Sequence, residues 1–130
     1  MPRSIESGGA PRPIGPYSQA VQVEATGLVF TAGMVGNDPA TGKLVAGGIE
    51  AETERALDNL EAVLAAAGLT FADVARTTVF LADLAEFPAM NAVYARRLGA
   101  HHPARSTVGV QALPLGARVE IDMLAARRPA

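Results

Sequence analysis

The chain has 130 residues, which suits one domain with a core of its own. Hydrophobic residues make up 49% of it and aromatic residues only 5%, so alanine, valine, leucine and isoleucine must build most of that core. A net charge of −2 argues against a nucleic-acid partner. The lack of an apolar run of about 18 residues argues against a membrane span. The lack of cysteine excludes a disulfide framework.

The start of the chain is rich in proline, glycine and serine. This composition predicts a flexible N-terminal arm over residues 1–14, followed by one domain over residues 15–130. Residues 1–13 lack the apolar block of a signal peptide, so we expect the protein in the cytoplasm.

The first half of the domain is predicted to form two strands and a helix. Alternating apolar residues favour strands over 17–23 and 28–32, joined by a hairpin turn, and a second turn follows at 38–42. From residue 49 to 67 the apolar residues recur every three or four positions, which predicts an amphipathic helix. Gly68 then stands where a helix commonly ends.

The second half continues with a turn, a strand and another helix. Thr70 and Asp73 have the spacing of a capped turn, and a β-branched run over 76–81 favours a strand. Asp83 is placed to cap a second helix over 84–98. The apolar stripe of that helix consists of Phe87, Met90, Tyr94 and Leu98.

Two further strands, over 105–111 and 118–125, complete the order β-β-α-β-α-β-β. This order predicts an α+β domain in which two helices cover one face of a mixed sheet. The strands are apolar on both sides in places, so the other face must meet something. We therefore expect self-association through the uncovered face.

The last two strands each carry one charge among small or apolar residues, Arg105 on the first and Glu120 on the second. A guanidinium presents a planar fork of donors to a carboxylate. A nearby carboxylate can position a water or accept a proton. This pattern suggests a site for a small organic acid, and the alternative is a structural ion pair within the sheet.

Other reactive side chains are scarce. The single lysine, Lys43, lies in a predicted exposed turn and lacks the desolvating pocket that a Schiff-base lysine needs. His101 and His102 are adjacent, with no acid nearby to complete a metal site. We therefore expect no metal and no cofactor, and catalysis by binding and electrostatics rather than through a covalent intermediate.

A set of short motifs spans nearly the whole chain. They are Gly-Pro-Tyr-Ser-Gln-Ala at 15–20, Thr-Ala-Gly at 31–33, Leu-Asp-Asn-Leu at 57–60, Thr-Thr-Val-Phe-Leu-Ala-Asp-Leu at 77–84, Asn-Ala-Val-Tyr at 91–94, Pro-Ala-Arg-Ser at 103–106 and Val-Glu-Ile at 119–121. In this order and spacing they resemble the reactive intermediate deaminase family, RidA, also called YjgF. The resemblance implies a chorismate-mutase-like fold and a homotrimer with active sites between subunits.

The same resemblance implies an activity. Members of the family hydrolyse reactive 2-imino and enamine acids, such as 2-aminoacrylate and 2-iminobutanoate, to 2-oxo acids and ammonia. Arg105 matches the arginine that binds the substrate carboxylate, and Glu120 matches a glutamate that lies at the site and can hold the water. Tyr17 matches a tyrosine at the pocket, where the alternative is a core aromatic.

Three more residues are candidates for substrate binding. Gly33 can allow a close backbone approach to a ligand, or it is an ordinary strand-end glycine. Asn91 is a polar group on an apolar helix face, so it contacts either the ligand or the backbone. Thr107 faces the same side of its strand as Arg105. Thr107, Ala32 and Met34 depart from the commonest family pattern, which leaves the preferred substrate side chain open.

Two other functions remain open from the sequence. Arg105 would serve equally well in a non-catalytic module that binds 2-oxo acids or other small carboxylates. A ribonuclease, an activity attributed to some relatives, is less favoured. That chemistry calls for acid–base histidines and a basic groove.

Overall fold

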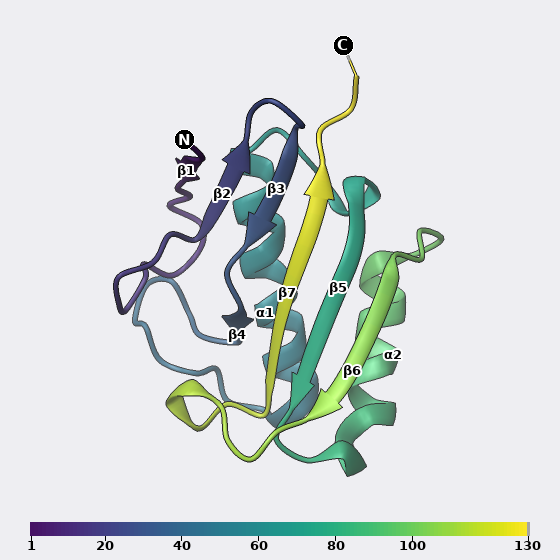
Figure 1. The fold of residues 1–130 in the computed structure, drawn as a ribbon. Coiled ribbons are helices and arrows are strands. Elements are labelled where there is room, and N and C mark those ends of the chain that lie inside the picture. Colours follow the sequence, from purple (N-terminus) through teal and green to yellow (C-terminus); the bar gives the residue numbers. More distant parts are fainter. Residues whose placement is uncertain (130) are drawn as a thin grey trace.

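The computed structural model describes residues 1–129 and contains one mixed sheet of seven strands (Figure 1). Along the sheet the strand order is β1-β2-β3-β7-β5-β6, and the short β4 pairs with β7 off this path. Pairing is antiparallel except between β5 and β6. The strands are β1 (Arg3–Ile5), β2 (Ala20–Val23), β3 (Leu28–Thr31), β4 (Met34–Val35), β5 (Val74–Leu81), β6 (Ala104–Gly109) and β7 (Val119–Ala126).

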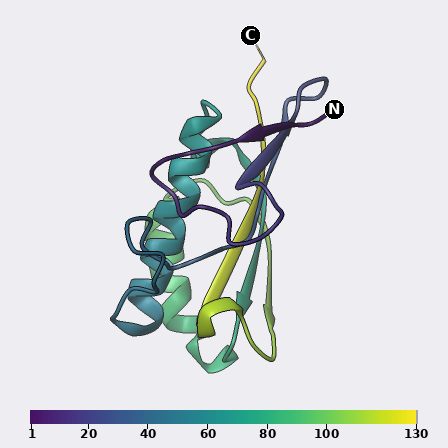
Figure 2. The same cartoon turned by 90° about the vertical axis from the view of Figure 1, so that its left-hand side faces the viewer.

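Two helices, α1 (Gly48–Ala66) and α2 (Phe87–Leu98), lie on the same face of the sheet (Figure 2). This arrangement confirms the predicted α+β domain. Three short 3-10 turns complete the chain, η1 (Phe71–Asp73), η2 (Leu84–Glu86) and η3 (Pro114–Gly116). Within residues 1–129 no helix is long and apolar enough to cross a bilayer.

The strands alternate between the helix-covered face and an uncovered face. On β7 the residues Val119, Ile121 and Met123 are buried under the helices, whereas Glu120 and its alternate neighbours point to the other side and are only half-buried. The uncovered face carries large apolar side chains that stay exposed, Phe30 at 42% and Val108 at 41%. A face of this kind is suited to contact with another protein surface.

The local signals for helix ends are confirmed. Gly68 has a φ of 76°, the left-handed conformation that ends α1. Thr70 and Asp73 form a capping box around η1. Asp83 does cap a helical turn, but that turn is η2, because the helix expected over 84–98 is divided and α2 begins at Phe87, with Pro88 in its first turn.

The expectation of a loose arm over residues 1–14 is wrong for most of that segment. Arg3–Ile5 forms β1 at the edge of the sheet, and Ile5 is only 2% exposed. The buried side chain of Gln19 then holds the following loop, donating from Nε2 to the backbone oxygens of Ser7, Ala10 and Pro11. The strand predicted to begin at residue 17 begins at Ala20, after this loop contact.

Candidate active site

Arg105 lies on β6, the edge strand of the sheet, and its side chain points toward α2. Its Nη1 donates to Asn91 Oδ1 over 2.7 Å. The guanidinium carbon lies 4.7 Å from the ring centroid of Tyr94 and 5.4 Å from that of Phe87. Three side chains of one helix therefore fix the guanidinium, while most of its donors stay free for a carboxylate.

The support behind Arg105 is itself held in place. The hydroxyl groups of Tyr94 and Thr77 are 2.8 Å apart and buried, which ties the Tyr94 ring to β5. Asn91 contacts Arg105 rather than the helix backbone, so its role is to orient the guanidinium. A rigid partner is what a bidentate carboxylate contact requires.

A cavity of about 370 Å³ opens beside Arg105. Asn91, Tyr94 and His102 also line it. His102 was not among the residues predicted for the site, and its position three residues before Arg105 is the only signal in the sequence that points to it. Thr107 follows Arg105 on the same side of β6, and its Oγ1 is buried without a hydrogen-bond partner in residues 1–129. We call Arg105, Asn91 and Thr107 the Arg105 half-site.

Glu120 lies on β7 with its carboxylate against Gly33. A Cβ atom on Gly33 would stand 2.6 Å from Glu120 Oε2 and 2.7 Å from its Cδ, so a larger residue there would displace the carboxylate. The close approach expected at Gly33 is therefore made by Glu120. Burial raises the pKa of Glu120, and the nearby charge of Asp122 adds to the effect.

A cavity of about 310 Å³ lies in front of Glu120. Tyr17 and Gly33 line it together with apolar side chains that include Met34 and Leu115. Tyr17 is 50% exposed and its hydroxyl accepts from the backbone nitrogen of Ile14, so it is not a core aromatic. We call Glu120, Gly33 and Tyr17 the Glu120 half-site.

A single chain does not bring the two half-sites together. Strand β5 lies between β6 and β7, with Arg105 level with Thr77 and Glu120 level with Phe80. Arg105 shares the helix-covered side with Thr77, whereas Glu120 is on the uncovered face. Residues 1–129 contain no ion pair between Arg105 and Glu120, so the alternative of a structural pair within the sheet is wrong.

The chain is similar in sequence and in structure to several known proteins. The sequence model of the family described as Endoribonuclease L-PSP matches residues 7–127. Protein DfrA of Myxococcus xanthus is 51% identical over 95% of this chain and 94% of its own length. The human 2-iminobutanoate/2-iminopropanoate deaminase is 43% identical over 98% of this chain and 91% of its own. The structure of Escherichia coli TdcF with bound serine superposes with a TM-score of 0.90 at 36% identity, covering 97% of this chain and 99% of that one.

Proposed function

We infer the reaction from one premise, which is that this chain belongs to the RidA/YjgF family of reactive intermediate deaminases. The protein hydrolyses reactive 2-imino and enamine acids, such as 2-aminoacrylate and 2-iminobutanoate, to 2-oxo acids and ammonia. The observation that carries this proposal is the Arg105 guanidinium, which Asn91 and Tyr94 hold with donors to spare for a substrate carboxylate.

The proposed chemistry needs no nucleophilic side chain, because an iminium carbon is already electrophilic. Arg105 binds the carboxylate, and backbone groups near Thr107 help to orient the imine nitrogen. Glu120 takes a proton from a water whose oxygen adds to the imine carbon. Glu120 gives this proton to the nitrogen of the carbinolamine. It then accepts the hydroxyl proton as the carbonyl forms and the carbon–nitrogen bond breaks, so ammonia and the 2-oxo acid leave and the proton on Glu120 passes to solvent. The raised pKa of Glu120 brings this carboxylate closer to the pKa that suits a base near neutral pH.

The site of this proposal is completed by a second copy of the chain. Arg105 and Glu120 lie on separate half-sites, and the uncovered face between them exposes Phe30 and Val108. If the Arg105 half-site of one subunit meets the Glu120 half-site of the next, the contact is heterologous, and a rotation that closes on itself gives a ring. The resemblance to the RidA family supports a ring of three subunits.

A homotrimer is therefore the expected particle. Light scattering coupled to size exclusion should give a mass of about three chains, since the apolar uncovered face remains exposed in a monomer. A stable monomer at micromolar concentration would contradict both the trimer and the site between subunits.

Imine hydrolysis tests the reaction itself. Threonine dehydratase releases 2-iminobutanoate, and semicarbazide traps the part that has not been hydrolysed. Added protein should lower the semicarbazone yield and speed the formation of 2-oxobutanoate. A preparation that binds 2-oxobutanoate but leaves the yield unchanged would favour the binding module, and cleavage of single-stranded RNA without imine hydrolysis would favour the ribonuclease.

A further inference from the structure

The strand β4 forms one wall of the Glu120 half-site, and its side chains Met34 and Val35 are buried. It has two residues and pairs only with β7, Met34 opposite Ile121 and Val35 opposite Glu120. Gly33 precedes it directly and packs against the Glu120 carboxylate. A two-residue strand with one neighbouring strand has few ladder hydrogen bonds, so the position of this wall also depends on the helix α1 that packs against it.

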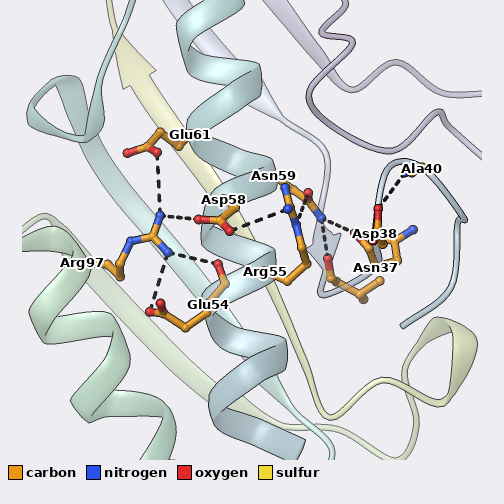
Figure 3. A network of polar contacts seen from close by, with 10 residues as sticks. Asn37, Asp38, Ala40, Glu54, Arg55, Asp58, Asn59, Glu61 and Arg97 are labelled. Carbon is orange, nitrogen blue, oxygen red and sulfur yellow. Dashed lines mark hydrogen bonds and ion pairs between the residues drawn. The ribbon is translucent and has the colours of Figure 1, made fainter. Parts of the chain in front are cut away.

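Asn59 of α1 supplies that support. Its side chain is fully buried, and its Nδ2 donates to the backbone oxygen of Val35 over 3.1 Å and to that of Asn37 over 3.0 Å (Figure 3). Both N–H groups of the amide donate, one to a carbonyl at each end of the short turn that follows β4. Buried carbonyls need such partners, so the contacts fix this segment to the helix.

The orientation of the Asn59 amide is set by charged residues around it. Arg55 Nε donates to Asn59 Oδ1 over 3.0 Å, which leaves the NH₂ group turned toward β4. Arg55 in turn pairs with Asp58, and Asp58 pairs with Arg97 of α2 over 2.8 Å (Figure 3). The same α2 carries Asn91, which orients Arg105. One network of side chains thus runs from the helix behind Arg105 to the strand beside Glu120.

We propose that Asn59 is a positioning residue of the active site, which holds β4 and Gly33 against Glu120 and so fixes the carboxylate at its working position. The inference rests on the proposed function only for its catalytic consequence. The placement of β4 by Asn59 stands on the hydrogen bonds alone.

The geometry makes Glu120 sensitive to this support. Gly33 packs directly against one side of the carboxylate, so a shift of β4 changes how closely the carboxylate is packed. Burial is the main cause of the raised pKa of Glu120, so looser packing exposes more of the carboxylate to water and lowers that pKa. The other charged or titratable groups beside it are Asp122 on β7 and, in the cavity wall, Arg12 and Tyr17. None of these belongs to β4 or α1.

The test is Asn59→Leu, which keeps the size of the side chain and removes both donors. We expect kcat for 2-iminobutanoate to fall roughly tenfold to a hundredfold, the loss that displacement of a catalytic group by about 1 Å can cause. The KM should change little, because the Arg105 half-site binds the carboxylate. In a ¹³C NMR titration the pKa of Glu120 should fall toward the ordinary range for glutamate.

Two further variants keep the test decisive. Val63→Ala, one turn along α1, truncates an equally buried side chain without a polar group, so it should lower the Tm but leave kcat and the pKa of Glu120 unchanged. Arg55→Met frees the Asn59 amide without entering the core. It should move kcat and the pKa in the direction expected for Asn59→Leu, by less, and it replaces that variant if Asn59→Leu fails to fold.

The outcomes separate this inference from the proposed function. A wild-type protein that hydrolyses no imine would refute the function, while the NMR titration would still decide the role of Asn59. If folded Asn59→Leu or Arg55→Met keeps the wild-type pKa of Glu120 and the wild-type kcat, Asn59 contributes to stability only and the inference is wrong.

Discussion

Arg105→Ala should lower kcat/KM for 2-iminobutanoate by about two orders of magnitude or more. A charged contact in a desolvated site contributes roughly 2–5 kcal/mol when its loss leaves the partner unpaired. At about 1.4 kcal/mol per factor of ten, this range of free energies includes the predicted hundredfold loss in kcat/KM. Arg105→Lys keeps the charge but loses the planar fork that Asn91 and Tyr94 orient, so it should be impaired nearly as badly.

The measurement is steady-state kinetics on trimers of matched concentration, with the mass checked by light scattering. Arg96→Ala is the matched control. Arg96 lies on α2, the helix that Arg105 contacts, but it pairs with Glu54 at the surface. It should keep the wild-type rate. Arg105→Ala acting at the wild-type rate would show that the carboxylate binds elsewhere, and Arg105→Ala that unfolds would show that Arg105 is mainly structural.

The elements with long repeating patterns were predictable from the sequence. The apolar spacing gave α1 to within one residue at each end, and Gly68 and the Thr70–Asp73 box marked the turns beyond it. Strands β1 and β4 were missed because three and two residues are too short for an alternation to be visible. The proline- and glycine-rich composition of the N-terminal segment also hid Ile5, whose burial fixes it to the sheet.

The candidate residues were found, but their arrangement was not. Alternation along one strand correctly places Thr107 on the side of Arg105. It does not reveal that β5 lies between β6 and β7, and this position of β5 separates Arg105 from Glu120. The sequence does contain a signal for the burial of Asn59. Ala56, Asn59 and Val63 follow the helical spacing of three and four, and they form a second buried row on α1. A polar residue within such a row needs buried partners.

Two inactive variants should restore activity to each other if the active site lies between subunits. Arg105→Ala chains keep an intact Glu120 half-site, and Glu120→Gln chains keep an intact Arg105 half-site with the carboxylate replaced by a group of the same size. A productive cleft needs one half from each kind of chain. Each half-site is intact in half of the chains, so a cleft has both of its half-sites intact in about a quarter of cases. Equal co-expression of the two variants should therefore give about a quarter of the wild-type activity.

The experiment carries its own control in the double variant Arg105→Ala/Glu120→Gln. Co-expressed with either single variant, it forms mixed particles that contain no complete cleft, so activity should stay at the level of the single variant. Two affinity tags, one on each kind of chain, verify that mixed trimers have formed. Mixed trimers of the two single variants without recovered activity would mean that Arg105 and Glu120 do not serve the same cleft. The opposite placement of the two residues on the sheet leads us to expect recovery, because no single chain can supply both to one substrate.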